Sequence, residues 1–434
     1  MHIYIIFSYI SYIFWYLFFK YEKWKNKKGF NNSNFFTLLK KYMRNLYQKK
    51  MFVDNHMKLK NKNNQRIFIF DYLRLFLVIL VIALHSVMAY SIYSYNRWHV
   101  FNPVRSIIFD VYALLFDYSI MSIFFFIAGF FALPSIKRRT IPEFIKKKFL
   151  RLIVPFIFGM IFVLPFAMYI RYLYFYDPSM GFFEYCLFYY WNDINQFMHL
   201  WFLPALFIFF LFFAVIYCSK KNFFDKPNGG FFSEISIESI FIFAILTGLT
   251  FFTIRLFLPY DRWVMIGDFY FVQPTRYIVY FAFFFFGILF YRAHFLPKKE
   301  KILKPVLWFS LTFCIVLITL SLYYFFMNYQ YSPSFVFIDS MLRVFFCLSI
   351  IMIFLFLFSK FLDFQSVFLQ RLSANVYAVY IIHYPFVVSL QYYLIDVPLS
   401  VFVKFFIVFS VSTIISFFVS EFFLRRLPLL KKIL

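Results

Sequence analysis

Arg74 and His85 are the two residues whose types and spacing point most directly to chemistry. They stand 11 positions apart in an otherwise apolar run. An α-helix puts residues at that spacing on one face, about 16 Å apart along its axis. A guanidinium holds phosphate or carboxylate groups by paired hydrogen bonds, and an imidazole accepts a proton or attacks a carbonyl. The pair therefore predicts an anion-binding group at one end of a helix and a base or nucleophile deeper in it.

His383 is a second histidine inside an apolar run, and it follows Arg371 by 12 residues. This spacing places it at about the depth of His85, on a separate helix. Ionisable groups inside membrane spans are costly and mark functional sites, although a single buried histidine is also common as a packing residue. Two histidines at matched depth favour a shared cavity, which Tyr380 would line as well.

A carboxylate at similar depth completes the set of candidate catalytic groups. Asp110 and Asp117 are seven residues apart, so they share one face of a further apolar run. Asp117 is expected near the depth of His85, where a carboxylate would hold the imidazole in one tautomer and support it as a base. The alternative is an ion pair between Asp117 and Arg343 or Lys404.

Such residues need helices that cross a membrane, and the composition provides them. Of the 434 residues, 63% are hydrophobic and 15% are charged, which excludes a large soluble enzyme and a disordered chain. A helix that spans a bilayer needs about 20 mostly apolar residues. We predict an all-α, polytopic transmembrane helix bundle. Its ten core spans cover residues 67–93, 107–133, 152–170, 200–218, 239–258, 275–291, 305–327, 336–358, 374–395 and 399–424.

Two further segments precede this core. Residues 1–19 predict an extra N-terminal membrane anchor, because the apolar run lacks the small-residue cleavage site of a signal peptide. Residues 20–65 predict a basic cytoplasmic segment, in which apolar residues from Phe36 to Leu46 recur at helical spacing and indicate an amphipathic helix. Residues 66–430 form the ten-span domain.

The net charge of +25 reflects 44 Lys and Arg residues against 19 Asp and Glu residues. Of the 44, 35 fall in the basic leader, in alternate connections and in the tail, whereas six fall in the intervening connections. Basic residues collect on the cytoplasmic side of membrane proteins, so both ends of the core are predicted to be cytoplasmic. The same charge attracts anionic membrane lipids. No folded soluble domain offers the basic face that nucleic-acid binding requires.

The intervening connections are rich in Trp, Tyr, Asn and Asp, as in the stretch Tyr190–Asp193. Flat rings beside polar groups suit sugars, but the same residues form the aromatic belt of ordinary membrane proteins, and both interpretations stay open. The four cysteines and nine glycines are scattered. The sequence therefore indicates no metal site, no disulfide framework and no glycine-rich nucleotide loop.

Five motifs in order along the core carry a resemblance to a known family. They are Asp71-Tyr-Leu-Arg74 with His85-Ser86, Phe124-Phe-Phe-Ile-Ala-Gly129-Phe130, Lys148-Phe-Leu-Arg151-Leu-Ile-Val-Pro155, His199-Leu-Trp201-Phe-Leu203 and Tyr380-Ile-Ile-His383-Tyr-Pro385. With these motifs the sequence resembles the acyltransferase family 3 membrane proteins, and within them the glucans biosynthesis protein C type. It differs at Ala128, where the family usually has Ser, and at Ser122, where many members carry an acid.

The resemblance implies an O-acyltransferase of the bacterial inner (cytoplasmic) membrane. It would move an acyl group from a cytoplasmic acyl-CoA-type donor, acetyl or succinyl, to a carbohydrate hydroxyl of an envelope glycan. The acyl-CoA is then a co-substrate, and no bound cofactor is implied. Arg74, Lys148 and Arg151 would bind the donor, while His85, supported by Asp117, would deprotonate the hydroxyl or carry the acyl group. Further pocket candidates are Asp71, His199, Trp201, Arg343, Tyr380 and His383.

Two other functions fit some of the same residues. A polytopic transporter or flippase of a glycan or lipid-linked substrate would use the buried charges as a relay, although glycine is scarce and no repeated halves are visible. A haem protein would use His85 and His383 as axial ligands.

Overall fold

The computed structural model describes the greater part of the ten-span core. The described residues are 67–92, 94, 98–192, 197–225, 235–258, 264–266, 270–293, 303–326 and 332–426. The chain divides into two units, Met1–Ile67 and Phe68–Leu434, and all the elements below belong to the second. The anchor predicted at 1–19 and the basic segment predicted at 20–65 lie outside the described residues.

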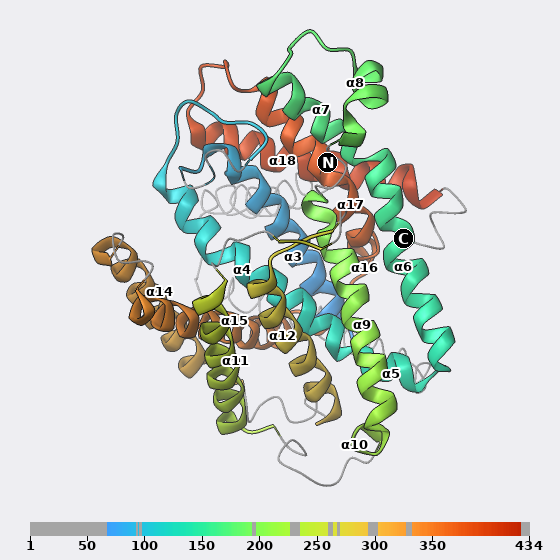
Figure 1. The fold of residues 1–434 in the computed structure, drawn as a ribbon, viewed down its shortest axis with the longest axis vertical. Coiled ribbons are helices and arrows are strands. Elements are labelled where there is room, and N and C mark those ends of the chain that lie inside the picture. Colours follow the sequence, from blue (N-terminus) through green and yellow to red (C-terminus); the bar gives the residue numbers. More distant parts are fainter. Residues whose placement is uncertain are drawn as a thin grey trace, which may run out of the picture. The chain divides into compact units, whose positions relative to one another are not determined.

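The second unit is built almost entirely of helices (Figure 1). Its first half contains α3 (Phe68–Val87), η1 (Met88–Tyr90), α4 (Ile107–Phe130), α5 (Ala132–Lys137), α6 (Ile141–Phe162), α7 (Leu164–Phe175), α8 (Phe182–Phe188), η2 (Tyr190–Asn192), η3 (Met198–Trp201), α9 (Phe202–Ser219) and α10 (Lys221–Asp225). Its second half contains α11 (Ile237–Phe257), β1 (Val264–Ile266), β2 (Tyr270–Val272), α12 (Pro274–Arg292), α14 (Pro305–Phe326), α15 (Pro333–Phe361), α16 (Val367–Ser373), α17 (Val376–Tyr393), α18 (Val401–Phe422) and η5 (Leu424–Arg426). The strands β1 and β2 pair as a short antiparallel hairpin.

The predicted all-α polytopic bundle is confirmed. Among the described helices, nine spans are long and apolar enough to cross a membrane, judged by length and composition. The pair α16 and α17, bent by 59° at the break between them, makes a tenth if it counts as one span. The protein is therefore an integral membrane protein with nine or ten described spans.

The helix that contains the start of the predicted third span, 152–170, begins before that span. Residues up to Arg151 were expected in a connection, but α6 starts at Ile141 and continues through the lysines. Its start is stabilised locally, because Thr140 and Glu143 form a capping box and a proline stands in the first turn. Basic residues fit in this part of the helix because their methylene stems lie along the apolar surface while their charged ends extend beyond it. The Lys148 ammonium, for instance, lies 3.7 Å from the centre of the Phe210 ring.

Contacts between elements define two ends of the bundle. At the basic end, where α3 and α6 begin and α9 and α12 end, Lys137 and Arg292 donate hydrogen bonds to the Phe224 and Phe223 carbonyls of α10, each at 2.8 Å. At the opposite end, Lys404 near the start of α18 donates to Asn102 in the connection between α3 and α4. Successive spans run alternately between these two ends.

The helices α4 and α12 approach each other unusually closely, at two glycines. A methyl group on Gly129 would lie 1.8 Å from the Phe284 carbonyl oxygen, and one on Gly287 would lie 2.0 Å from that of Phe126. Small residues let membrane helices pack backbone against backbone. This crossing holds α4 beside α12 in the interior of the bundle.

We expect Gly287→Ala to destabilise the protein by about 2 kcal/mol, because the added methyl group must push two backbones apart. The measurement is the temperature at which helical circular dichroism is lost in detergent. Gly181→Ala is the matched control, since a methyl group there meets no atom within 4 Å. Equal unfolding temperatures for the two variants would contradict the close crossing.

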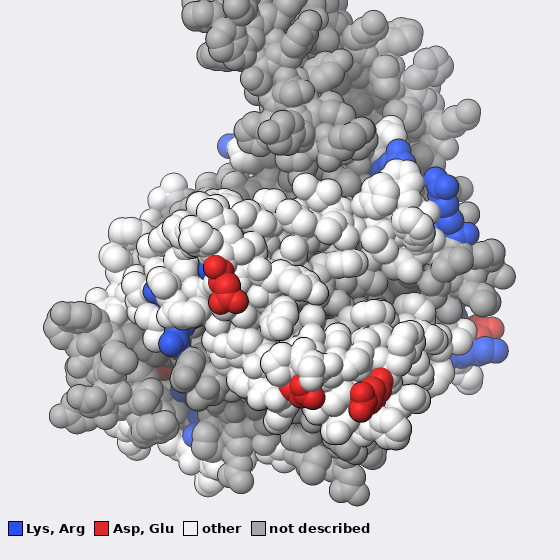
Figure 2. Space-filling view, turned by 90° about the horizontal axis from the view of Figure 1, so that it is seen from above, with Lys and Arg blue, Asp and Glu red and all other residues white. Residues whose placement is uncertain are grey.

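The outer surface fits a lipid environment. The helix α14 lies at the edge of the bundle, where it packs on α15 (Figure 1). Large apolar side chains such as Phe313 and Val306 on α14 are exposed. Figure 2 shows a face on which charged side chains are few and are separated by wide uncharged areas. In a membrane protein, exposed apolar side chains such as those of α14 contact lipid rather than water.

Candidate active site

His85 and His383 meet at the centre of the candidate site. His85 lies in the last turn of α3, and His383 lies in the middle of α17, a helix that also contains Pro385. Nδ1 of His85 is 2.9 Å from Nε2 of His383, and the two rings are nearly parallel, at 5°. The sequence predicted two histidines at matched depth, and the structure brings them into direct contact.

The backbone of α17 fixes the protonation of this pair. Nδ1 of His383 lies 2.8 Å from the carbonyl oxygen of Tyr380 and 3.1 Å from that of Val379. A carbonyl oxygen only accepts, so Nδ1 of His383 must carry a hydrogen. In the neutral ring Nε2 is then the acceptor, and Nδ1 of His85 donates to it. Neutral rings are favoured because a buried cation without an anion is costly to desolvate. The arrangement leaves Nε2 of His85 unprotonated.

Exposure also distinguishes the two histidines. His383 is fully buried, whereas His85 is only partly buried. His85 therefore combines an unprotonated ring nitrogen with a side chain that is only partly buried. These are the properties that a general base or a nucleophile requires.

A short segment between α3 and α4 covers His85. The Trp98 ring stacks on the His85 ring, with centroids 5.6 Å apart and planes 26° apart. Nε1 of Trp98 donates to the side-chain oxygen of Gln391 at 2.7 Å. The Gln391 amide in turn donates to the carbonyl oxygens of His85 and Ser86, at 2.9 and 3.1 Å. The indole is thus tied, through one glutamine of α17, to the same turn of α3 that carries the base.

Two more histidines surround the pair. His199, in η3, donates through Nε2 to the carbonyl oxygen of Ile381 at 2.9 Å, and its ring stacks on Tyr384 at 4.5 Å. His99 pairs with the hydroxyl of Tyr384 at 2.8 Å. Burial, with a smaller effect of the Arg171 charge, lowers the pKa of His99 to about 3, so this ring stays neutral near pH 7.

The backbone is strained beside His199. Met198 has φ of 42°, and it is a residue with a side chain in the left-handed region. Such conformations are uncommon outside glycine and concentrate at functional sites. This turn opens α9 and presents His199 to α17, where the hydroxyl of Tyr380 donates to the His199 carbonyl oxygen.

The predicted donor-binding cations gather at the basic end. Lys148 lies within electrostatic reach of Arg151, Arg139 and Arg74. Arg74 is half-exposed, with its guanidinium 4.8 Å from the Phe131 ring centre and 3.4 Å from an oxygen of Asp71. Arg74, Lys148 and Arg151 were predicted separately from two spans, and they form one cationic cluster. The cluster stands about 16 Å along α3 from His85.

The predicted pairing of Asp117 with His85 is wrong. Within the described part of the chain, the Asp117 carboxylate pairs with Arg276 of α12 at 2.7 Å, and Nδ1 of His85 bonds to His383. Arg276 stands in the first turn of α12, so it reaches α4 where Asp117 faces it. The orientation that Asp117 was expected to give His85 comes from His383 instead.

Arg343 is also placed away from the histidines. It shares the buried carboxylate of Asp339 with Arg255, at 2.8 and 2.6 Å. Breaking such a buried pair costs several kcal/mol, so the group has a structural role between α11 and α15. Lys404 does not pair with Asp117 among the described residues either, since it holds Asn102 and the Ile395 carbonyl.

The haem hypothesis does not fit the geometry. Axial ligands bind iron from opposite faces of a porphyrin, with the metal between the two nitrogens. Here the facing nitrogens of His85 and His383 are 2.9 Å apart and share a hydrogen bond. A direct imidazole contact leaves no space for an iron atom between them.

Sequence reasoning placed some neighbours of His85 and missed others. Trp201 follows His199 but packs on Tyr280 of α12, 5.7 Å between centroids, at the edge of the site. Trp98 and His99 lie in one of the intervening connections, which the sequence marks only as rich in aromatic and polar residues. Gln391 was not singled out, although an amide inside an apolar run is a signal of a buried hydrogen-bond network.

Comparison with known proteins agrees with this geometry. Neither the curated proteins nor the solved structures give a match to this chain. The family model described as the acyltransferase domain matches residues 67–421, which spans every element from α3 to the last turn of α18. This range contains all four histidines of the site and the cationic cluster. The chain therefore belongs to acyltransferase family 3 and is a membrane acyltransferase.

Proposed function

We propose that the protein transfers an acyl group from an acyl-CoA-type donor to a carbohydrate hydroxyl of an envelope glycan. The single observation that carries the proposal is the hydrogen bond between Nδ1 of half-buried His85 and Nε2 of His383, from which we infer an unprotonated Nε2 on His85. The cationic cluster of Arg74, Lys148 and Arg151 supports the choice of an anionic donor.

The chemistry at His85 is an ordinary acyl transfer. Nε2 of His85 takes the proton of the acceptor hydroxyl as its oxygen attacks the thioester carbonyl carbon. The new C–O bond forms, the C–S bond breaks, and the proton passes from Nε2 to the leaving thiolate. His383 accepts the hydrogen bond from Nδ1 of His85 throughout, so the ring cannot turn its protonated nitrogen toward the hydroxyl.

The two ends of the bundle differ in a way that supports separate entry of the two substrates. The basic end carries the cationic cluster and, by the distribution of Lys and Arg, faces the cytoplasm in this proposal. The cytoplasm is where acyl-CoA is available. Trp98 is buried where it stacks on His85, on the side of the opposite end, so a sugar reaches the base when this ring moves. The donor then enters from the basic end and the glycan from the other, in a bacterial inner membrane.

The test is a reconstitution of the full chain in liposomes with acetyl-CoA or succinyl-CoA and extracted envelope glycan. We expect release of free thiol that requires the glycan, and a matching mass increase of the glycan by one acyl group. Glycan movement across the bilayer without thiol release would instead identify a transporter or flippase.

The role of Arg74 gives a separate prediction. Arg74→Ala should raise the KM for acyl-CoA about tenfold, because one charge-assisted contact with the donor is lost. Since the chemistry lies about 16 Å away, kcat should change much less. Steady-state thiol release at varied donor concentration measures both constants.

Arg105→Ala is the matched control for Arg74→Ala. It removes the same charge at the opposite end of the bundle, just before α4. An equal rise of KM in the two variants would show that total charge, rather than the cluster, attracts the donor.

A further inference from the structure

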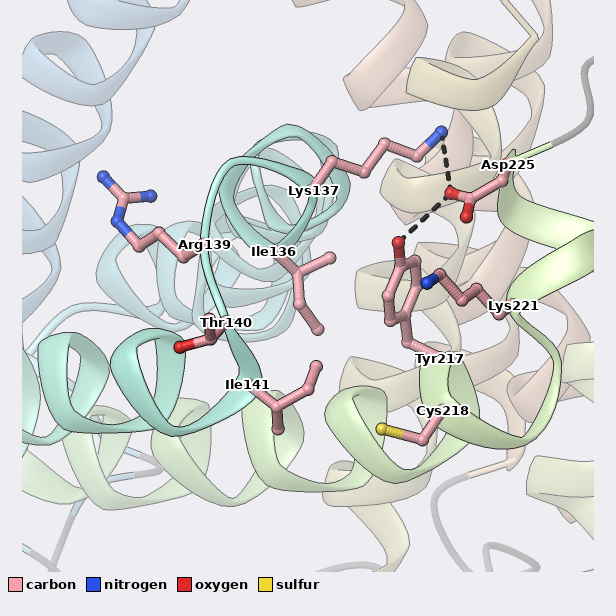
Figure 3. A pocket seen from close by; sticks show the side chains of 9 residues that line it. All are labelled: Ile136, Lys137, Arg139, Thr140, Ile141, Tyr217, Cys218, Lys221 and Asp225. Carbon is pink, nitrogen blue, oxygen red and sulfur yellow. Dashed lines mark hydrogen bonds and ion pairs between the residues drawn. The ribbon is translucent and has the colours of Figure 1, made fainter.

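Several cations of the described bundle are neutralised by a carboxylate. At the basic end, Lys137 is paired with Asp225 at 3.4 Å (Figure 3). In the opposite half, Arg255 and Arg343 share the carboxylate of Asp339 at 2.6 and 2.8 Å. A charge inside a membrane span is costly without such a partner, so an unpaired cation there points to a function.

Arg171 is a cation of this kind. It lies one turn before the end of α7, in the half of the bundle opposite the cationic cluster, and its side chain is partly exposed. Its guanidinium lies 5.6 Å from the centre of the Phe175 ring, and it forms no ion pair with any described residue. Asp177, six residues later, accepts hydrogen bonds from Ser179 instead. Arg171 thus lacks a carboxylate within the described part of the chain.

Arg171 stands beside the segment that covers His85. The hydroxyl of Tyr174, three residues later in α7, donates to the carbonyl oxygen of Phe101 at 3.1 Å. The ring of Phe175 also packs on that of Phe101, with 5.9 Å between centroids. Phe101 belongs to the connection between α3 and α4. The end of α7 is therefore in direct contact with the segment that must move to admit a sugar.

The charge of Arg171 also reaches the interior of the site. It acts on His99 and on the hydroxyl of Tyr384, and both of these side chains are buried. The Tyr384 ring lies 5.0 Å from the His85 ring, measured between centroids. An arginine that served only to reach the membrane surface would extend away from such groups. The guanidinium is therefore close to the route by which an acceptor reaches His85.

His99 has a ring nitrogen that no described residue satisfies. Its Nε2 pairs with the hydroxyl of Tyr384 at 2.8 Å, whereas its Nδ1 is buried without a hydrogen-bond partner. Buried polar atoms without partners are rare in native proteins. If Tyr384 donates to Nε2, then Nδ1 carries the hydrogen of the neutral ring and donates to an anion. Because His99 follows Trp98 directly, the movement that opens the route to His85 also moves this nitrogen.

We propose that Arg171 binds an anionic group of the acceptor glycan, a carboxylate or a phosphate, while a sugar hydroxyl approaches His85. The inference rests on the proposed function for the class of acceptor. A guanidinium gives paired, charge-assisted hydrogen bonds to either group. Nδ1 of His99 is a second donor for the same anion once the covering segment has moved. Arg171 therefore determines specificity, and it makes the enzyme selective for acidic glycans over neutral ones.

A phosphate at this end of the bundle has a second source, the headgroup of an anionic lipid, because arginines near helix ends also reach the membrane surface. The effect of Arg171 on buried His99 and Tyr384 favours the glycan, since a headgroup stays at the surface of the bundle. The experiment separates the two sources by offering each alone.

The probes are the acidic and the neutral fractions of extracted envelope glycan, separated by anion exchange. Their affinities are measured by calorimetry on the full chain in phosphatidylcholine nanodiscs, without an acyl donor. We expect the acidic fraction to bind about tenfold more tightly, as for one charge-assisted contact. Arg171→Ala should remove most of this preference, and Arg171→Lys should keep part of it, because lysine retains the charge but not the paired hydrogen bonds.

Arg105→Ala is the matched control, since it removes a positive charge at the same end of the bundle, just before α4. Equal loss of the preference in Arg105→Ala and Arg171→Ala would overturn the proposal, because total charge would then attract the glycan. So would an Arg171→Ala variant that keeps the preference but binds less phosphatidylglycerol than the wild type, because the guanidinium would then hold a lipid.

The binding measurement needs no turnover, so it is separate from the test of the proposed function. An Arg171-dependent preference for acidic glycan without acyl transfer would leave the anion site assigned and the reaction wrong. Acyl transfer to acidic and neutral glycans alike, unaffected by Arg171→Ala, would leave the reaction standing and the anion site wrong.

Discussion

His85→Ala should lower kcat for acyl transfer by about a thousandfold, while the protein still folds and inserts into the membrane. The loss is this large because general base catalysis contributes roughly 10²- to 10⁴-fold, and no other unprotonated ring nitrogen in the described site is as accessible. Thiol release from acetyl-CoA in the presence of glycan is the measurement. Donor binding should persist, because the cationic cluster stands about 16 Å along α3.

Donor affinity is therefore the internal control for His85→Ala. A variant that loses turnover and CoA binding together has lost its fold, and it says nothing about the base. Asp117→Asn provides the comparison for a half-exposed ionisable residue outside the site, because Asp117 pairs with Arg276. Glycan esterification by His85→Ala at the wild-type rate would contradict the role of His85.

Replacing His383 gives the second large effect. His383→Leu should lower kcat about a hundredfold with little change in either KM, because His85 loses the acceptor that fixes its tautomer. The ring of His85 is then free to present its protonated nitrogen to the acceptor hydroxyl. His383 is a positioning residue, since it acts through His85 and touches no substrate.

His383→Gln distinguishes positioning from packing. The amide oxygen of glutamine accepts from Nδ1 of His85, and its NH₂ group donates to the Tyr380 or Val379 carbonyl in place of the imidazole. We expect this variant to recover a substantial part of kcat that His383→Leu loses. Equal activity of the Leu and Gln variants, at equal thermal stability, would refute the hydrogen-bonded pair.

The membrane spans were predictable because the length of each apolar run and the positions of the basic residues between the runs can be read from the sequence. The start of α6 is an exception. Lys146–Arg151 reads as a cytoplasmic connection by charge, yet it is helical in α6. Hydropathy marks where a span enters the apolar core, whereas the capping box at Thr140 sets where the helix begins. Hydropathy and helix capping are different physical properties, and the predicted start of the span rests on hydropathy alone.

The sequence predicted the depth of the site residues along their helices, but only some of the side chains that they contact. Counting residues from the ends of the spans placed His85 and His383 at one level, and they touch. The same counting placed Asp117 there, but helical periodicity fixes only which residues share a face, and the neighbour of that face depends on packing. The glycine crossing sets α4 beside α12, and Arg276 of α12 takes the carboxylate.

Trp98 and Gln391 escaped prediction for a related reason. Their hydrogen bond joins the connection after α3 to α17, almost 300 residues later in the chain. The sequence around neither residue indicates which side chain it contacts. A buried amide is informative only once the element that it faces is known.

Pro385 explains why the histidines of η3 and α17 are joined as they are. A proline has no N–H, so inside a helix it leaves the carbonyl four residues earlier without its usual partner. In α17 that carbonyl belongs to Ile381, and it is the one to which His199 donates. The carbonyl that Pro385 leaves without a helical partner thus accepts a hydrogen bond from a side chain of another helix. This hydrogen bond joins the turn at Met198 to the middle of α17, and the His199 ring lies 6.4 Å from the His85 ring, measured between centroids. In the proposed function, the glycan is then admitted by a movement on the Trp98 side, whereas the donor enters from the basic end.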